Sequence, residues 1–189
     1  MLAKSKRPWP SPAIQKIANA FRLWGWVGFW AQLSLAFTSG MVLLFAVSGR
    51  SFTADSEAGI GLGIFWGVAG ILALGVGIVL AFRYTQIAKG LRDPAFHFHP
   101  KKSYAVQLLR IGVLTGLVGV LFTLLGAGAT VSVLIAKTVS QPPGVAITDP
   151  TKIVRALDVF VMLANLNGIT AHFVGIVTSL WLLERLHTP

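Results

Sequence analysis

The chain has 189 residues, of which 54% are apolar and only 12% are charged, about half the charged share of a typical soluble domain. This balance excludes a soluble globular domain and indicates an integral membrane protein of one domain. The formal net charge is +10, but the basic residues gather in short segments between apolar runs. Anionic lipid head groups explain that pattern better than nucleic acid does, so we expect no nucleic-acid partner. The absence of cysteine excludes disulfides, thiolate nucleophiles and cysteine-ligated metals.

Residues 1–22 form a basic N-terminal segment. Ser11 and Pro12 suit the N-cap and the first turn of a helix, and Ile14 and Ile17 then begin an apolar face. This pattern predicts a short amphipathic helix that lies in the membrane interface. The alternative is a simple extension of the first membrane span. No short apolar core with a small-residue cleavage site follows, so we expect no cleaved signal peptide.

Four apolar runs follow within residues 23–189, and each is long enough to cross a hydrocarbon core of about 30 Å. They cover about residues 23–48, 59–82, 111–136 and 159–183. We therefore predict an all-α, polytopic membrane protein with four transmembrane helices. Glycines recur on one face of the second and third runs: Gly59, Gly63 and Gly67, then Gly112, Gly116, Gly119 and Gly126. They predict tight helix packing, and the alternative is that glycine is common in membrane helices anyway.

Residues 83–110 form the longest polar segment, and its middle contains His97 and His99. Imidazole suits zinc, copper and iron, so this pair is a candidate metal site. The alternative is a surface loop whose phenylalanines dip into the interface. Five basic side chains in and before this segment are candidates for binding lipid head groups: Lys16, Arg22, Arg83, Lys101 and Lys102.

The positions of lysine and arginine also predict the orientation. The N-terminal segment, the segment 83–110 and the C-terminus together hold twelve of the sixteen. These three segments lie on one side of the membrane only if there are four spans. The positive-inside rule then places both termini in the cytoplasm or its organellar equivalent.

The fourth run, 159–183, contains no charged residue, but its middle carries Asn165, Asn167 and His172. Together with Gln32 of the first run, these residues are candidates for helix packing or for binding a ligand. A spacing of seven residues returns to nearly the same helix face, so Asn165, His172 and Ser179 form one polar line. A ridge of small residues runs beside it: Ala164, Gly168, Ala171 and Gly175. Both faces are expected to point at protein, with the other helices packed around this one.

His172 is the ionisable residue deepest in the predicted membrane, which makes it a candidate functional group. It could be a neutral side chain bonded to Gln32 or Asn165, a metal ligand, or a ligand of chlorophyll magnesium. We expect no required cofactor, with chlorophyll, carotenoid or iron as alternatives. No catalytic motif is present, so we expect the protein not to be an enzyme. Asp158 is expected to cap the start of the fourth helix.

A family resemblance rests on four phrases. They are FRLWGWVGFWAQL (21–33), AFRYTQIAKGLR (81–92), LLGAGATVSVLIAKT (124–138) and RALDVFVMLANLNGITAHFVGIVTSLWLL (155–183). Residues 11–189 resemble cyanobacterial members of the family that includes the 21-kDa inner-envelope protein of the chloroplast translocon, also called the permease in chloroplasts. The resemblance implies four helices in a cyanobacterial plasma or thylakoid membrane, or in the plastid inner envelope, with cytoplasmic or stromal termini. It also implies two conflicting roles, an accessory part in protein import and iron uptake, and no catalytic residues.

We therefore expect a non-enzymatic accessory or assembly subunit of a larger membrane complex, for protein translocation or photosynthesis. Its expected partners are the lipid bilayer and either other subunits or further copies of itself. The first alternative is a permease for iron or another metal ion that acts as an oligomer. The second is a pigment-binding membrane subunit.

Overall fold

The computed structural model describes residues 11–50, 58–93, 101–140 and 154–187, and every element within these ranges is an α-helix. The helices are α1 (Pro12–Arg50), α2 (Ala58–Arg92), α3 (Lys102–Val139) and α4 (Ala156–His187). All four are long and apolar enough to cross a membrane. The prediction of an all-α, four-span membrane protein is confirmed.

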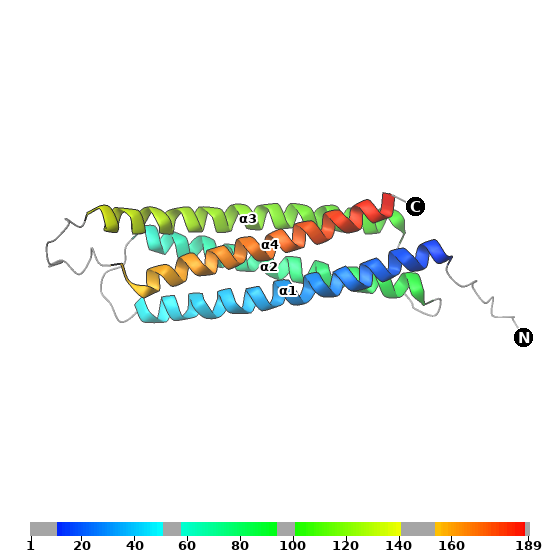
Figure 1. Cartoon of the computed structure of the whole chain (residues 1–189), viewed down its shortest axis with the longest axis horizontal. Coiled ribbons are helices and arrows are strands. Elements are labelled where there is room, and N and C mark those ends of the chain that lie inside the picture. Colours follow the sequence, from blue (N-terminus) through cyan, green and yellow to red (C-terminus); the bar gives the residue numbers. More distant parts are fainter. Residues whose placement is uncertain (1–10, 51–57, 94–100, 141–153, 188–189) are drawn as a thin grey trace, which may run out of the picture.

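The four helices run side by side, each antiparallel to the helix before it (Figure 1). One end of the bundle contains the first residues of α1 and α3 and the last residues of α2 and α4. The five predicted head-group side chains lie there, so we call it the basic end. α1 and α3 each contact both α2 and α4, and α2 and α4 also contact each other across the centre. α4 therefore touches all three other helices, as the sequence predicted.

The helices are longer than a membrane requires. They contain 39, 35, 38 and 32 residues in chain order, against about 20 for a hydrocarbon core of about 30 Å. Residues 12–22 continue into α1 without a break, and Ala18 and Phe21 are fully buried in the bundle. In the structure this segment is therefore an extension of the first span, the second of the two alternatives. Its apolar face packs on the other helices.

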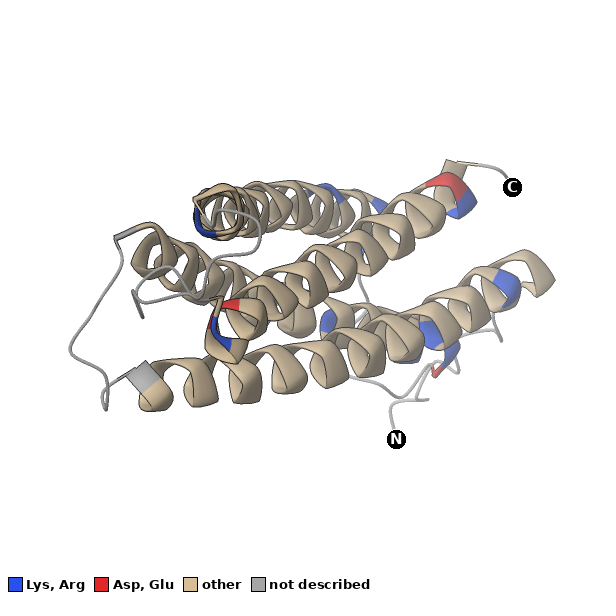
Figure 2. Ribbon diagram, turned by 60° about the vertical axis from the view of Figure 1, so that its left-hand side comes forward, with Lys and Arg blue, Asp and Glu red and all other residues tan. Residues whose placement is uncertain are grey.

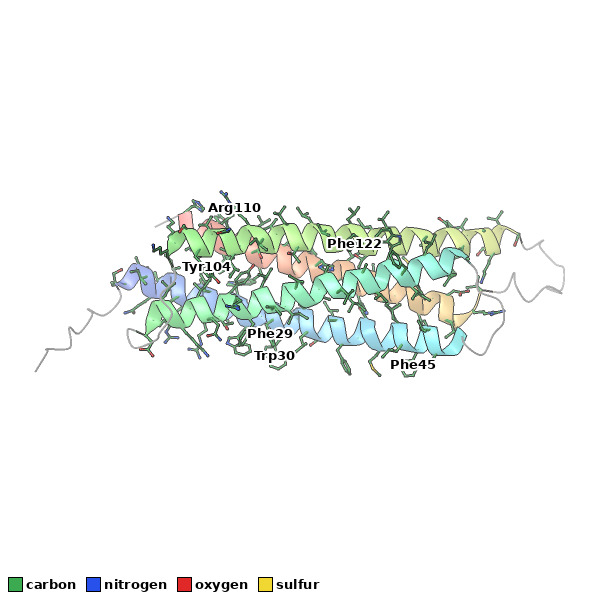
Figure 3. The ribbon with its side chains drawn as sticks, turned by 180° about the vertical axis from the view of Figure 1, so that it is seen from behind. Phe29, Trp30, Phe45, Tyr104, Arg110 and Phe122 are labelled. Atoms are coloured by element: carbon green, nitrogen blue, oxygen red, sulfur yellow. The ribbon has the colours of Figure 1, made fainter. Side chains whose placement is uncertain are left out.

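Apolar residues form two clusters in the bundle, one toward each end. The cluster at the basic end centres on Phe21, Tyr84 and Leu182, and the cluster at the opposite end contains Leu43 and Val161. Large apolar side chains also cover the outside; Trp30 and Phe45, for example, are 57% and 62% exposed and point away from the bundle (Figure 3). Charged residues lie toward the helix ends and leave long uncharged middles (Figure 2). Such a surface suits lipid.

An ion pair joins α3 to α4 at the end opposite the basic end. Lys137 Nζ lies 2.7 Å from Asp158 Oδ2, and the two side chains are only 7% and 2% exposed. The same oxygen accepts the backbone N–H of Arg155 at 3.2 Å, which confirms that Asp158 caps the start of α4. One carboxylate therefore fixes both the first turn of α4 and its position against α3.

Replacing Lys137 with methionine should destabilise the bundle by about 3 kcal/mol, because it removes the ammonium group that faces a buried carboxylate. Adding Asp158→Asn should recover part of this loss, because asparagine still accepts the Arg155 N–H and buries no charge. Thermal unfolding in detergent would measure both effects. Lys89→Met, at an exposed lysine of α2, is the control and should change stability by less than about 0.5 kcal/mol. Equal stability of Lys137→Met and the control would contradict the role given to the pair.

Candidate functional site

The centre of the bundle is polar along one face of α4. Asp158, Asn165, His172 and Ser179 follow one another at seven-residue intervals, and each is at most 2% exposed. We call these four residues the polar stripe. The sequence predicted its last three members and their inward direction, and the structure adds Asp158. Of the neighbouring ridge, Ala164, Gly168 and Ala171 are buried and Gly175 is half-buried.

Two rows of glycine face the polar stripe, also at seven-residue intervals. The rows are Gly63, Gly70 and Gly77 on α2, and Gly112, Gly119 and Gly126 on α3. A Cβ atom added to Gly126 would overlap the Asn165 side chain, and one added to Gly119 would overlap the His172 ring. The glycines therefore have a steric role, and the packing prediction made from them is confirmed.

Asn165 is fully buried and bonds α4 to α2. Its Nδ2 donates to the carbonyl oxygen of Gly63 at 3.2 Å and to that of Val161, one turn earlier on α4, at 2.9 Å. Its Oδ1 is buried and has no hydrogen-bond partner among the residues that the structure describes. Leaving such an acceptor unpaired costs about 1–3 kcal/mol.

His172 makes the corresponding contact two turns farther along α4. Its Nε2 lies 3.1 Å from the carbonyl oxygen of Gly70, and because a carbonyl only accepts, we assign the ring proton to Nε2. The sequence offered Gln32 or Asn165 as hydrogen-bond partners in one of three alternatives for His172, but in the structure the imidazole bonds to the backbone of α2 instead. A backbone carbonyl has no side-chain signature, so the sequence did not indicate this partner.

A cavity of about 10 Å³ lies next to His172, and Gln32, Tyr84 and Ser179 also line it. The hydroxyl groups of Tyr84 and Ser179 lie 3.0 Å apart and share a hydrogen bond. The volume is close to that of a single water molecule, which needs polar neighbours such as these. The structure thus brings Gln32 and His172 together around one small polar space.

Two other predicted sites stand apart from this centre. Asn167 is half-buried on a different face of α4, because two residues correspond to about 200° of rotation around a helix. His97 and His99 lie outside the described residues, so the metal prediction stays a prediction. The described part of the chain contains no group of three or more His, Cys, Asp or Glu residues that could hold a metal ion. The five predicted head-group side chains are all exposed at the basic end: Lys16, Arg22, Arg83, Lys101 and Lys102.

Two contacts between the polar stripe and other helices were not predicted from the sequence. They are the ion pair between Asp158 and Lys137 and the hydrogen bond between Ser179 and Tyr84. Spacing gives three of the four residues: Asp158 stands seven residues before Asn165, and Tyr84 stands seven residues after Gly77. Lys137 is not on the α3 glycine row, which continues to Val133 and Ser140, so the seven-residue repeat does not indicate it.

Gly119→Ala should destabilise the bundle by about 1–3 kcal/mol, because the new methyl group has to displace the His172 ring. The matched control is Gly128→Ala, on the same helix, where nothing lies within 4 Å of the added Cβ. The control should be neutral or stabilising by up to about 1 kcal/mol, since alanine is the better helix former. Unfolding in detergent measures both, and equal effects would show that the close contact at Gly119 is unimportant.

Comparisons with known proteins place this bundle in a family. The family model described as protein of unknown function (DUF3611) matches residues 11–187. Protein TIC 21, chloroplastic, of Arabidopsis thaliana is 31% identical, over 98% of this chain and 63% of its own length, so the chain spans about three fifths of that relative. No solved structure matches the chain. The predicted resemblance is confirmed, and because the family model extends over all four helices, the chain belongs to the DUF3611 family of proteins of unknown function.

Proposed function

We propose that this integral membrane protein is a non-enzymatic accessory or assembly subunit of a larger membrane complex, for protein translocation or photosynthesis. One observation carries the proposal: every side chain of the polar stripe is engaged in a contact between helices. The contacts are Asp158 with Lys137, Asn165 with Gly63, His172 with Gly70, and Ser179 with Tyr84. Polar groups used in this way hold a bundle together and leave little for binding a substrate.

The filled centre supports the same proposal. The cavity beside His172 holds about 10 Å³, and glycines opposite the stripe are already in contact with its side chains. A transported ion needs a continuous polar path, so a single copy in this conformation suits packing better than conduction. The family resemblance implies two conflicting roles, an accessory part in protein import and iron uptake, and the first of them agrees with this proposal.

A metal permease is the second candidate, and the unpartnered Oδ1 of Asn165 favours it. Imidazole suits iron, carbonyl oxygen suits hard cations such as manganese, and His172 follows Asn165 on the same helix face. The two residues are seven positions apart, or about 10 Å along the helix axis, too far to hold one ion together. This candidate therefore requires either several copies of the chain or an opened bundle.

Pigment binding receives less support from the geometry. A histidine that ligates chlorophyll magnesium presents a free ring nitrogen to a large flat macrocycle. The Nε2 of His172 is instead bonded to Gly70, and the ring lies against Gly119.

Purification of the tagged protein from its native membrane in mild detergent should yield other membrane subunits in fixed stoichiometry. Mass spectrometry would identify them, and metal analysis and an absorption spectrum of the same fraction would test the alternatives. His172→Gln, which keeps a donor near Gly70, should retain these partners, whereas His172→Ala should lose them together with stability. A partner-free oligomer that contains iron, and loses iron in His172→Gln, would favour the permease instead.

The orientation can be tested because the natural sequence has no cysteine to remove. Ser103→Cys at the basic end should be protected from a membrane-impermeant maleimide in intact cells or organelles. Ser140→Cys at the opposite end should be labelled, since both serines are exposed. Permeabilising the membrane should make the two positions equally reactive. Labelling of Ser103→Cys in intact membranes would reverse the orientation that the positive-inside rule predicts.

A further inference from the structure

A cavity of about 380 Å³ opens at the basic end of the bundle, and the terminal turns of all four helices form it. We call it the vestibule. Its walls are apolar: Ile14 and Ile17 of α1, Ile87 and Leu91 of α2, Ala105 of α3 and Leu186 of α4. The cavity has the size of a small ligand site, and the contacts of the polar stripe do not involve it.

The vestibule lies beyond the level of the lipid tails. Exposed arginines on three helices mark the inner boundary of the hydrocarbon core: Arg22, Arg83 and Arg110. Ile14, Leu91 and Lys102 lie eight residues farther out on the same helices, a distance of about 12 Å. Ile17, Ile87 and Ala105 lie only four or five residues beyond the arginines, at the level of a head-group layer about 5–8 Å thick. The inner part of the vestibule is therefore at head-group level, and its mouth faces water rather than acyl chains.

The rim of the vestibule is cationic. Lys101 and Lys102 line it, and no Asp or Glu is among its described lining residues. α3 begins at this rim without an acidic residue in its first turn, and Lys101 at its N-cap gives no side-chain hydrogen bond. The first N–H groups of α3 therefore add to the attraction for negative charge. An occupant that matches both features combines apolar side chains with carboxylates.

We propose that the vestibule binds a segment of a partner protein in which apolar side chains stand next to Asp or Glu, approaching from the side of the basic end. The apolar side chains fill the cavity, and the carboxylates meet Lys101, Lys102 and the start of α3. The mouth of the vestibule lies beyond the head groups, which favours a protein segment over a phospholipid. This inference rests on the proposed role as a subunit of a complex, and it names the surface through which that role is exercised.

The test uses the full chain in phosphatidylcholine nanodiscs and two short fluorescein-labelled peptides. Both have the same leucine and phenylalanine core, flanked by glutamates in one peptide and by lysines in the other. Fluorescence anisotropy should show saturable binding of the glutamate peptide and at least about tenfold weaker binding of the lysine peptide. Absence of saturable binding of the glutamate peptide overturns the proposal.

Variants separate the vestibule from the general charge of this end. The double variant Lys101→Glu/Lys102→Glu should reduce the affinity for the glutamate peptide by more than about tenfold. The matched control is the double variant Lys89→Glu/Arg92→Glu, which makes the same charge change on exposed side chains outside the vestibule. It should reduce the affinity for the glutamate peptide by less than about threefold. Ala13→Phe, at an exposed position on the vestibule wall, should weaken binding by filling the cavity without disturbing the core.

Three further outcomes would overturn the proposal. Equal losses in the two double variants would assign binding to the overall positive field of this end. Loss of glutamate-peptide binding when phosphatidylglycerol is added would assign the rim to lipid. The third outcome is that the Lys101/Lys102 double variant and Ala13→Phe both still co-purify with partners in unchanged stoichiometry. The protein would then keep its role as a subunit, but the vestibule would not be the surface that binds the partners. If the unmodified chain has no partner, the subunit role itself fails.

Discussion

A polar side chain inside a membrane needs a hydrogen-bond partner, and this bundle supplies that partner from glycine backbone. Lipid offers no donor or acceptor, so Asn165 and His172 are stable only where another helix approaches closely. Gly63 and Gly70 accept their hydrogen bonds, and the glycines of α3 leave room for the side chains from the other direction. The close approach of the helices and the pairing of the polar groups therefore depend on each other.

The two apolar clusters and the long helix ends follow from this centre. Glycine rows bring α2, α3 and α4 together in the middle, where little apolar area is available. The larger side chains around Phe21 and around Leu43 then close the bundle toward its two ends. At the basic end the helices continue past the arginines, and their terminal turns line the vestibule. The same chain thus has a tightly packed middle and a hollow, basic end.

The number of helices, the polar stripe and the glycine faces were predictable because hydropathy and helical periodicity determine them. The full length of α1 was not predictable from the sequence. Contacts of Phe21 with other helices, rather than the local sequence, fix its first turns in the bundle. Asn167 was grouped with Asn165 by polarity, although the helical angle separates them. The bond from His172 to Gly70 was unpredictable because every residue offers a carbonyl, and only the packed structure selects one.

The seven-residue repeat has a consequence for how α4 finds its place. If α4 moved along its axis by one repeat, about 10 Å, in either direction, two of Asn165, His172 and Ser179 would again face a glycine on α2 and on α3. The middle of the bundle alone therefore discriminates only weakly between neighbouring alignments. The ends do not repeat: Asp158 meets Lys137 only in the observed alignment, and Ser179 meets Tyr84 only there. These two end contacts act as stops that select one register, much as a single buried polar residue fixes the alignment of a coiled coil.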